Sequence, residues 1–170
     1  SSSSPGISLK QEGISYLSGA QLPAVVVNMM RGGPGLGNIA GAQGDYFQAT
    51  RGGGNGDYHV VVIAPGTVQE MADYTVKAFE IADKYRVVVM ILGDGTLGQM
   101  MEPVDFDSIP APVNSNKDWA TVGTELKREH NIVNSLYLSP EALEKTIRER
   151  EERYNIIREK EARFEAHDIE

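Results

Sequence analysis

The residues that most clearly suggest chemistry are Arg31 and the glycines that follow it. Arg31 comes directly after an apolar run at residues 24–30, and ten of the chain's 18 glycines lie between Gly32 and Gly56. A guanidinium binds a carboxylate or a phosphate through two parallel hydrogen bonds. Glycine disfavours a helix and lets the backbone turn or approach a ligand closely. The pattern predicts an anion-binding loop, with a solvated arginine on a mobile surface loop as the alternative.

A dinucleotide site is a second interpretation of the same loop. Residues 35–40, Gly-Leu-Gly-Asn-Ile-Ala, satisfy the G-x-G-x-x-G/A fingerprint after a predicted strand. That fingerprint needs its glycines to open a helix whose N-terminus holds the pyrophosphate, and it needs an acidic residue at the end of the next strand. Further glycines interrupt the required helix here, and Asp57 precedes the next strand instead of ending it. The spacing therefore disfavours a dinucleotide site.

A third interpretation places a metal at Gly93-Asp94-Gly95, which follows an apolar run at residues 87–92. A carboxylate and an amide oxygen can bind a magnesium ion that phosphate oxygens also bridge, and Asn114 or Asn116 would supply the amide. The alternative is a turn in which Asp94 accepts hydrogen bonds from nearby backbone donors. Because both asparagines lie beyond a proline-rich stretch, the turn is favoured and no metal site is predicted.

Composition excludes several classes of function. The 170 residues are 41% hydrophobic and 24% charged, which is ordinary for one soluble globular domain. A net charge of −8 disfavours nucleic acid as a partner, and the apolar runs are far shorter than the roughly 20 residues of a membrane span. The chain has no cysteine, so it cannot hold an iron–sulfur cluster through thiolates. Its histidines lack metal-ligand spacing; they are His59, His130 and His167.

Three apolar runs predict the strands that must position the loop, at residues 25–27, 60–63 and 87–92. Continuous β-branched runs of this kind are typical of strands buried on both faces of a parallel sheet. Thr67-Val-Gln-Glu70 is a capping box, which opens a helix between the second and third strands. A strand–helix–strand unit builds a parallel sheet. The predicted fold class is therefore α/β, with an open, mainly parallel sheet and flanking helices.

Two helices are predicted beside these strands. Residues 7–17 form a short polar helix, with Ser4-Pro5 as its cap and first helical residue. The helix after Thr67 has an apolar face at three- and four-residue spacing. The predicted members of that face are Met71, Ala72, Thr75, Ala78, Phe79 and Ala82.

The C-terminal half divides into a connector and a charged helix. We expect an α/β domain at residues 1–106, an extended connector at 107–138 anchored by Trp119, and a charged helix at 139–170 that begins at Ser139-Pro140. Apolar residues form a narrow stripe on that helix: Leu143, Ile147, Tyr154, Ile157 and Phe164. We expect a solvated linker helix resting lightly on its own domain, with docking onto a partner as the alternative. Because the chain begins without methionine and ends within a charged run, we expect a piece of a larger subunit.

Several ordered sequence blocks together resemble a known family. The blocks lie at residues 2–17, 27–38, 43–50, 68–71 and 91–100. They are similar to the α subunit of the 2-oxoacid:ferredoxin oxidoreductases, most of all to the type that acts on branched-chain 2-oxoacids such as 3-methyl-2-oxobutanoate. The similarity runs from residue 1 to about residue 106 and continues more loosely through the charged helix.

The resemblance implies a cytoplasmic, thiamine diphosphate-dependent enzyme that oxidatively decarboxylates a 2-oxoacid to an acyl-CoA. In this family the cofactor lies between two similar α/β domains, and this chain resembles the domain on the pyrimidine side. A β subunit would then bind the diphosphate and magnesium, and another subunit would hold iron–sulfur clusters that pass electrons to ferredoxin. Coenzyme A would take the acyl group.

The resemblance also assigns residues. Arg31 matches the family arginine that pairs with the 2-oxoacid carboxylate, with a structural salt bridge as the alternative. The residues implied to line the cofactor beside it are Ser3, Ser4, Gly32, Gly33, Asn38, Gln43 and Asp45. Asp45 and Arg51 have a second interpretation, in which they tie the loop to the sheet.

Two further expectations follow from the resemblance. The family glutamate that bonds the pyrimidine ring, and a nearby hydroxyl residue that helps to bind substrate, align before Ser1, so this chain alone is expected to be inactive. A second subunit domain is expected after the charged helix. A non-enzymatic role also remains open, in which the chain is an assembly module whose glycine loop and acidic surface contact partner subunits.

Overall fold

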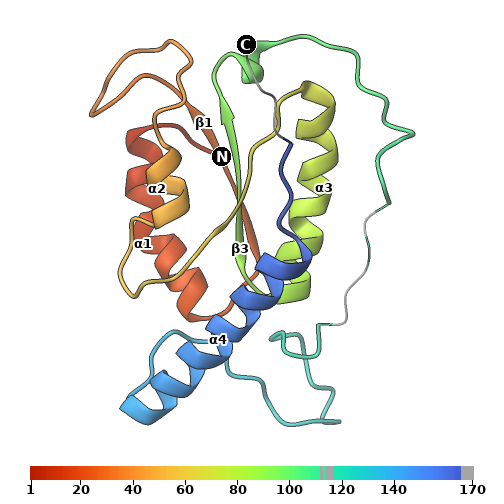
Figure 1. Cartoon of the computed structure of the whole chain (residues 1–170). Coiled ribbons are helices and arrows are strands. Elements are labelled where there is room, and N and C mark those ends of the chain that lie inside the picture. Colours follow the sequence, from red (N-terminus) through yellow and green to blue (C-terminus); the bar gives the residue numbers. More distant parts are fainter. Residues whose placement is uncertain (112, 114–116, 166–170) are drawn as a thin grey trace. The chain divides into compact units, whose positions relative to one another are not determined.

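The structure, a computed structural model, describes residues 1–111, 113 and 117–165. The chain forms two compact units, Ser1–Ser135 and Leu136–Glu170. The first unit is built on a three-stranded parallel sheet in the order β1-β3-β2 (Figure 1). Its strands are β1 (Ala24–Met30), β2 (Val61–Ile63) and β3 (Val88–Asp94). The predicted fold class, α/β with an open parallel sheet, is confirmed.

The last strand in the sequence lies in the centre of the sheet. β3 pairs with β1 on one side and with β2 on the other, and its residues from Val88 to Gly93 are buried. The residues of β2 and most of those of β1 are only partly buried, because these strands have one neighbour each within the sheet. Burial on both faces, predicted for all three strands, therefore holds for β3 alone. The outer edge of β1 also forms a bridge with Ser2.

The predicted βαβ unit is present. α3 (Val68–Tyr85) lies between β2 and β3 in the sequence, and the two strands pair in parallel. Thr67 Oγ1 accepts a hydrogen bond from the Glu70 amide at 3.1 Å, as the capping box predicts. The Glu70 carboxylate accepts from the Gly66 amide at 2.7 Å, one residue before the cap. Local sequence therefore specifies where this helix begins.

The buried face of α3 differs from the predicted one. Its buried residues are Ala78, Ile81, Ala82 and Tyr85, which follow the three- and four-residue spacing of one helix face. Phe79 was placed on the apolar face, but it is 57% exposed. The prediction was wrong because Phe79 lies one residue, or about 100°, away from Ala78 around the helix.

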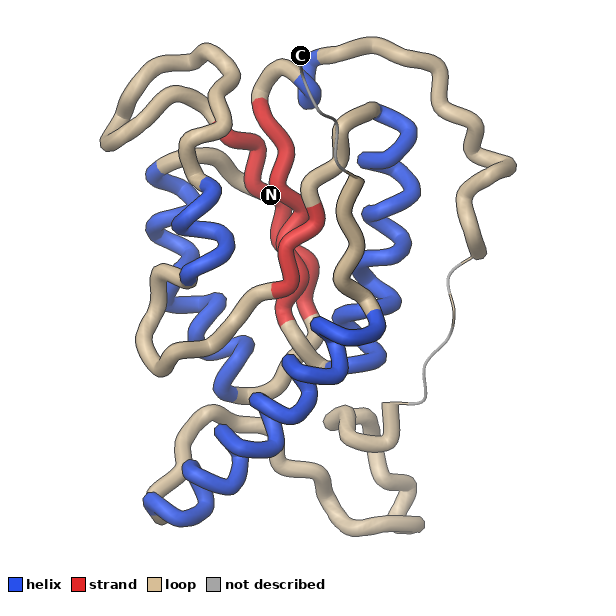
Figure 2. The backbone as a smooth tube through the Cα atoms, in the orientation of Figure 1, coloured by secondary structure: helices blue, strands red, loops and turns tan. Residues whose placement is uncertain are grey.

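Two helices cover the opposite face of the sheet from α3 (Figure 2). They are α1 (Pro5–Gly19) and α2 (Tyr46–Arg51). α1 begins at the predicted proline, but Ser4 makes no side-chain capping bond. α2 lies within the segment that was expected to be a continuous loop, because residues 45–51 contain no glycine and Ala49 packs into the core.

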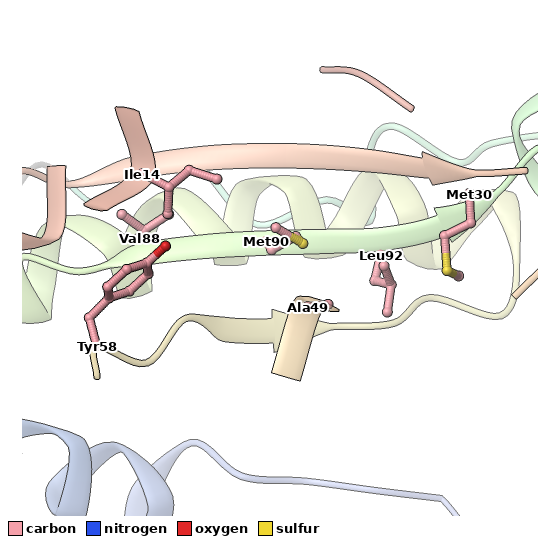
Figure 3. Close-up of a cluster of buried hydrophobic side chains, with 7 residues drawn as sticks. All are labelled: Ile14, Met30, Ala49, Tyr58, Val88, Met90 and Leu92. Atoms are coloured by element: carbon pink, nitrogen blue, oxygen red, sulfur yellow. The ribbon is translucent and has the colours of Figure 1, made fainter. Parts of the chain in front are cut away.

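The hydrophobic core lies between these two helices and the sheet (Figure 3). Val88, Met90 and Leu92 alternate along β3 and point to this side, where Ile14 of α1 and Ala49 of α2 pack against them. Val89 and Ile91 alternate with them and point to the α3 side, and both are fully buried. The central strand thus contributes to both cores and fixes the positions of the strand ends.

The connector follows β3 and the short 3-10 helix η1 (Leu97–Gln99), and it is held against α3. Near the start of α3, the Gln69 side chain accepts from the Asp105 amide at 2.7 Å. Near its end, Lys117 pairs with Asp83 at 2.9 Å. The Arg86 guanidinium lies 4.4 Å from the centre of the Trp119 ring, so the only tryptophan anchors the connector as predicted.

The second unit contains α4 (Pro140–Lys160). Its start was predicted correctly, since the Ser139 hydroxyl accepts a hydrogen bond from the Ala142 amide at 3.3 Å. The helix ends at Lys160, so Phe164 does not belong to a helical stripe. Residues 166–170 of the predicted charged helix lie outside the described residues. In the described ranges, no helix has the length and apolar character needed to cross a membrane.

Candidate functional site

The candidate site lies where β1 and β3 end. Met30 and Asp94 are opposite each other in the parallel register, and the Gly95 amide donates to the Met30 carbonyl at 2.8 Å. Arg31 is the next residue after β1. Open parallel α/β sheets bind their ligands at this carboxyl edge. The fold therefore brings Arg31 and Asp94, 63 positions apart in the sequence, to the same edge.

The guanidinium of Arg31 donates hydrogen bonds to the loop that follows it. Its Nη1 atom donates to the Leu36 carbonyl and, at 2.8 Å, to the Asn38 carbonyl. The salt bridge considered as an alternative is absent among the described residues. Both bonds use Nη1, so the edge formed by Nε and Nη2 donates to none of the described residues. Arg31 is partly exposed. One side of the guanidinium thus fixes the loop, and the other side can take a carboxylate in two-point fashion.

Backbone hydrogen bonds close the loop above Arg31. The Asn38 amide donates to the Gly32 carbonyl at 2.9 Å, and the Gly32 amide donates to the Ala40 carbonyl at 3.0 Å. At Gly37, where φ is +55°, an added Cβ would lie 1.7 Å from the Gly32 carbonyl oxygen. Glycine is therefore required at this position for the loop to close.

The returning part of the loop contacts the turn after β3. Gly41 forms an antiparallel bridge with Arg31, and a Cβ at Gly41 would lie 2.6 Å from Thr96 Oγ1. Gln43 Nε2 donates to Asp94 Oδ2 at 2.9 Å. Gln43 was predicted to bind the cofactor, and here its side-chain amide donates a hydrogen bond to a carboxylate of this chain instead. Residues 41–43 are held between the ends of β1 and β3.

Asp94 accepts hydrogen bonds on both oxygens. Oδ1 accepts from the Leu97 amide at 2.8 Å, and Oδ2 accepts from Gln43. The Leu97 amide, and then the Gln43 side chain, hold the pKa of the Asp94 carboxyl below its ordinary value because both bonds favour the ionised form. The predicted capping turn at Gly93-Asp94-Gly95 is therefore present.

The residues described give no support for a metal site. Asn114 and Asn116, the amides considered as ligands beside Asp94, lie outside the described residues, and so does His167. In the described part of the chain, no group of three or more His, Cys, Asp or Glu residues could hold a metal ion.

Asp45 ties the loop to the sheet. Asn28 Nδ2 donates to Asp45 Oδ2 at 3.1 Å, and the Asn28 side chain is fully buried on the α1 side of β1. Asp45 is the residue that precedes α2. The tying role considered for Asp45 is thus present. Arg51 does not share it, because its guanidinium lies 4.1 Å from the centre of the Phe47 ring, one turn away in the same helix.

Three buried polar atoms, in β1 and in the segment before α1, lack a hydrogen-bond partner among the described residues. The Ser2 amide donates to the Val27 carbonyl at 2.9 Å, so the segment before α1 runs along this strand. The hydroxyls of Ser3 and Ser4 are buried and have no hydrogen-bond partner among the described residues, and neither has Asn28 Oδ1. Buried polar atoms left without a partner are uncommon and mark positions where water or a ligand binds. The structure therefore keeps both serines as candidate ligand residues.

The dinucleotide interpretation is not supported. Among the described residues, no helix begins at Gly35 or Gly37, and the next helix, α2, starts only at Tyr46. These glycines form the closed loop above Arg31 instead. A dinucleotide fingerprint requires them at a strand-to-helix turn.

Sequence reasoning missed two residues of this edge. Asn28 was overlooked as the hydrogen-bond donor to Asp45. It is the one polar side chain in the apolar run of residues 24–30, and this could have indicated a specific partner. Asp94 was assigned only a local turn, and nothing in the sequence pairs it with Gln43, 51 positions away. Long-range partners of this kind depend on strand order.

Comparisons with known proteins identify the family. Residues 1–167 match the family described as "Pyruvate flavodoxin/ferredoxin oxidoreductase, thiamine diP-bdg". The ketoisovalerate oxidoreductase subunit VorB of Methanothermobacter thermautotrophicus is 51% identical over 164 residues, which cover 96% of this chain and 46% of that protein. The 2-oxoglutarate synthase subunit KorA of Methanocaldococcus jannaschii is 46% identical over 103 residues, which cover 60% of this chain and 28% of that protein.

A solved structure shows the same fold. It is the 2-oxoglutarate:ferredoxin oxidoreductase from Magnetococcus marinus, with a TM-score of 0.70 and 24% identity over 99% of this chain and 34% of that chain. The chain spans about half the length of the VorB relatives that it matches. The family expected from the sequence blocks is confirmed. This chain belongs to the thiamine diphosphate-binding domain family of the pyruvate flavodoxin/ferredoxin oxidoreductases.

Proposed function

We propose that the chain is part of a thiamine diphosphate-dependent 2-oxoacid:ferredoxin oxidoreductase that converts a branched-chain 2-oxoacid to its acyl-CoA and passes electrons to ferredoxin. Family membership and the 51% identity to a ketoisovalerate oxidoreductase subunit support this function. The proposal includes the expected cytoplasmic location. It also includes a β subunit, an iron–sulfur subunit and coenzyme A as partners.

The observation that carries the proposal is the free edge of Arg31. Nη1 is occupied by the carbonyls of Leu36 and Asn38, and this holds the guanidinium plane in one orientation. The Nε–Nη2 edge is then left to bind the substrate carboxylate through two charge-assisted hydrogen bonds. A guanidinium already held by the loop loses less side-chain freedom when substrate binds, and this favours binding.

The residues present fit only part of a thiamine diphosphate site. When bound, this cofactor supplies a nucleophilic carbon and an electron sink for decarboxylation. Both carboxylates at this edge, Asp45 and Asp94, already accept hydrogen bonds within the chain. Neither is therefore assigned to a ring nitrogen or to magnesium. The proposed cofactor contacts of this chain are the unpartnered hydroxyls of Ser3 and Ser4 and van der Waals contact with the loop at Gly32, Gly33 and Asn38, because the Gly32 and Asn38 amides already donate within the loop.

The proposal assigns the remaining parts of the site to other subunits. The proposed β subunit holds the diphosphate and magnesium, as the family resemblance implies. The proposed iron–sulfur subunit holds the clusters, as the family resemblance implies, and the 170 residues here contain no cysteine that could hold one. What this chain contributes is the position of the substrate carboxylate and one wall of the site.

The test is an Arg31→Ala change in the assembled complex. Losing two hydrogen bonds to a charged group, at roughly 1.5 kcal/mol each, is expected to raise KM for the 2-oxoacid about 100-fold. Arg31→Lys is expected to raise KM less than Arg31→Ala, since lysine keeps the positive charge but cannot donate two parallel hydrogen bonds to a carboxylate. Arg51→Ala is the matched control, because Arg51 contacts only the Phe47 ring among the interactions described.

The assembly-module alternative has its own supporting observation. Leu36 and Ile39 are apolar residues of the loop, and 83% and 93% of their surfaces are exposed. Exposed apolar side chains of this kind suit a subunit interface. Under this alternative, Arg31→Ala would prevent assembly and leave the activity of each assembled complex unchanged. Size-exclusion chromatography of the complex, combined with turnover per complex, separates the two functions.

A further inference from the structure

Two segments far apart in the sequence meet through one amide–carboxylate pair. Gln43 Nε2, on the returning part of the loop, donates to Asp94 Oδ2 at 2.9 Å, and Asp94 Oδ1 accepts from the Leu97 amide at 2.8 Å. Asp94 is therefore held both by its own turn and by the loop. An amide donating to an ionised carboxylate makes a stronger bond than one between two neutral groups.

Close backbone packing accompanies this pair. A Cβ added at Gly41 would lie 2.6 Å from Thr96 Oγ1 and 2.7 Å from the Thr96 amide nitrogen. A Cβ at Gly95 would lie 3.3 Å from Gly41 Cα. The loop and the turn after β3 thus lie against each other at Gly41 and Gly95, and the Gln43–Asp94 pair adds a side-chain hydrogen bond across the contact.

The same segment of loop is bonded to Arg31. Gly41 forms a backbone bridge with Arg31, and the Ala40 carbonyl accepts from the Gly32 amide at 3.0 Å. The Asn38 carbonyl accepts from Arg31 Nη1 at 2.8 Å. Any movement of residues 38–43 away from β3 would therefore move the Asn38 carbonyl, one of the two that orient the guanidinium. A chain of hydrogen bonds and backbone contacts thus joins Asp94 to the guanidinium of Arg31.

We propose that Asp94 is a positioning residue, which holds Gln43 and through it the loop carbonyls that orient Arg31 toward the 2-oxoacid carboxylate. This inference rests on the proposed function of the chain. It also gives Gln43 a different role from the cofactor contact expected from the family resemblance. In this role Gln43 acts on another residue of the chain and touches neither cofactor nor substrate.

The pair allows a test by exchange of donor and acceptor. Gln43→Glu places a carboxylate against Asp94 and breaks the contact. Asp94→Asn alone is expected to be mild, because the Gln43 amide can turn and offer its oxygen to the new amide group. The double variant Gln43→Glu with Asp94→Asn restores an amide–carboxylate pair with the roles reversed. It also keeps the net charge of the wild type.

The measurements are made on the assembled complex. Gln43→Glu is expected to raise KM for the 2-oxoacid about tenfold, the size of effect that one charge-assisted hydrogen bond can have, with kcat and KM for coenzyme A changed by less than about twofold. Hydrogen–deuterium exchange at residues 38–43 is expected to become faster. The double variant is expected to restore both quantities.

Gln48→Glu is the matched control, because it adds the same charge nearby and its amide donates to the Ser8 hydroxyl, which can donate to a carboxylate instead. It is expected to leave KM and exchange at residues 38–43 unchanged. An equal effect in this control would overturn the proposal, since charge alone would then explain the result.

Other outcomes distinguish the alternatives. If the double variant stays as impaired as Gln43→Glu, Gln43 contacts cofactor or substrate directly and the positioning role is wrong. If exchange quickens while KM does not change, the pair holds the loop but does not position Arg31. If the wild-type complex turns over no 2-oxoacid, the proposed function fails. Exchange at residues 38–43 then still shows whether Asp94 holds the loop, so the two failures are told apart.

Discussion

Asn28, inside β1, donates a hydrogen bond to the carboxylate of Asp45, the residue at which α2 begins, at 3.1 Å. This contact attaches the end of the glycine loop to the central sheet, while Arg31 and Asp94 hold its beginning and its returning part. Side chains of β1, of β3 and of the residue that follows β1 thus hold one loop. The loop is therefore attached to the sheet through side-chain hydrogen bonds.

Asn28→Asp is expected to destabilise the fold more than Asn28→Ala. The alanine variant loses one partly buried hydrogen bond to a charged group, which costs about 1–3 kcal/mol. The aspartate variant places a buried carboxylate against Asp45, and repulsion and desolvation add to that loss. Urea unfolding of the full chain at neutral pH measures both. Asn55→Asp is the control, since Asn55 is exposed and accepts from Ser15; equal losses in Asn28→Asp and Asn55→Asp would contradict the prediction.

Asp94 is expected to make stability depend on pH in the acidic range. Because its pKa in the folded chain is lower than its ordinary value, ionised Asp94 stabilises the fold above the ordinary pKa. That stabilisation is lost as pH falls through the folded-state pKa. The stability difference between wild type and Asp94→Asn should therefore be largest near neutral pH and disappear in strong acid. Unfolding curves at several pH values test this, with Asp57→Asn removing the same charge from an exposed position.

Gly37→Ala is expected to disrupt the loop above Arg31. The backbone has φ of +55°, and an added Cβ would lie 1.7 Å from the Gly32 carbonyl oxygen, so the loop must open. Gly35→Ala is the matched control, because Gly35 has φ of +65° and nothing within 4 Å of its added Cβ. Gly35→Ala is therefore expected to cost only the free energy of placing an alanine at positive φ, about 1–2 kcal/mol. Only Gly37→Ala should raise KM for the 2-oxoacid strongly in the complex, and similar values for both variants would show that the clash is unimportant.

Thr67→Ala is expected to lower the free energy of unfolding by about 1 kcal/mol. The threonine hydroxyl accepts from the Glu70 amide at 3.1 Å, and alanine leaves this amide without its cap. Thr67→Ser keeps the hydroxyl and should stay near the wild-type value. Urea unfolding compares the three proteins. An unchanged stability in Thr67→Ala would mean that the Glu70 bond to Gly66 is enough to start α3.

Much of the first unit followed from local sequence. The strands predicted at residues 60–63 and 87–92 begin and end within two residues of the observed ones, whereas β1 extends three residues beyond its predicted end at Val27. The caps at Thr67 and Ser139 started α3 and α4 where predicted. These features depend on interactions within a few residues, so their sequence determinants are contiguous. The sequence blocks also identified the family, and Arg31 was correctly placed at the end of its strand.

Tertiary structure alone decided how these parts meet. The sequence does not state that β3 lies between β1 and β2, and this order brings Asp94 beside Met30 and Gln43. It also decides that Phe79 faces outward and that Asn28 is buried. The physical reason is that burial and long-range hydrogen bonding depend on which surfaces pack together. Periodicity within one segment specifies the shape of a helix or strand, and the neighbours of that segment determine which of its faces are covered.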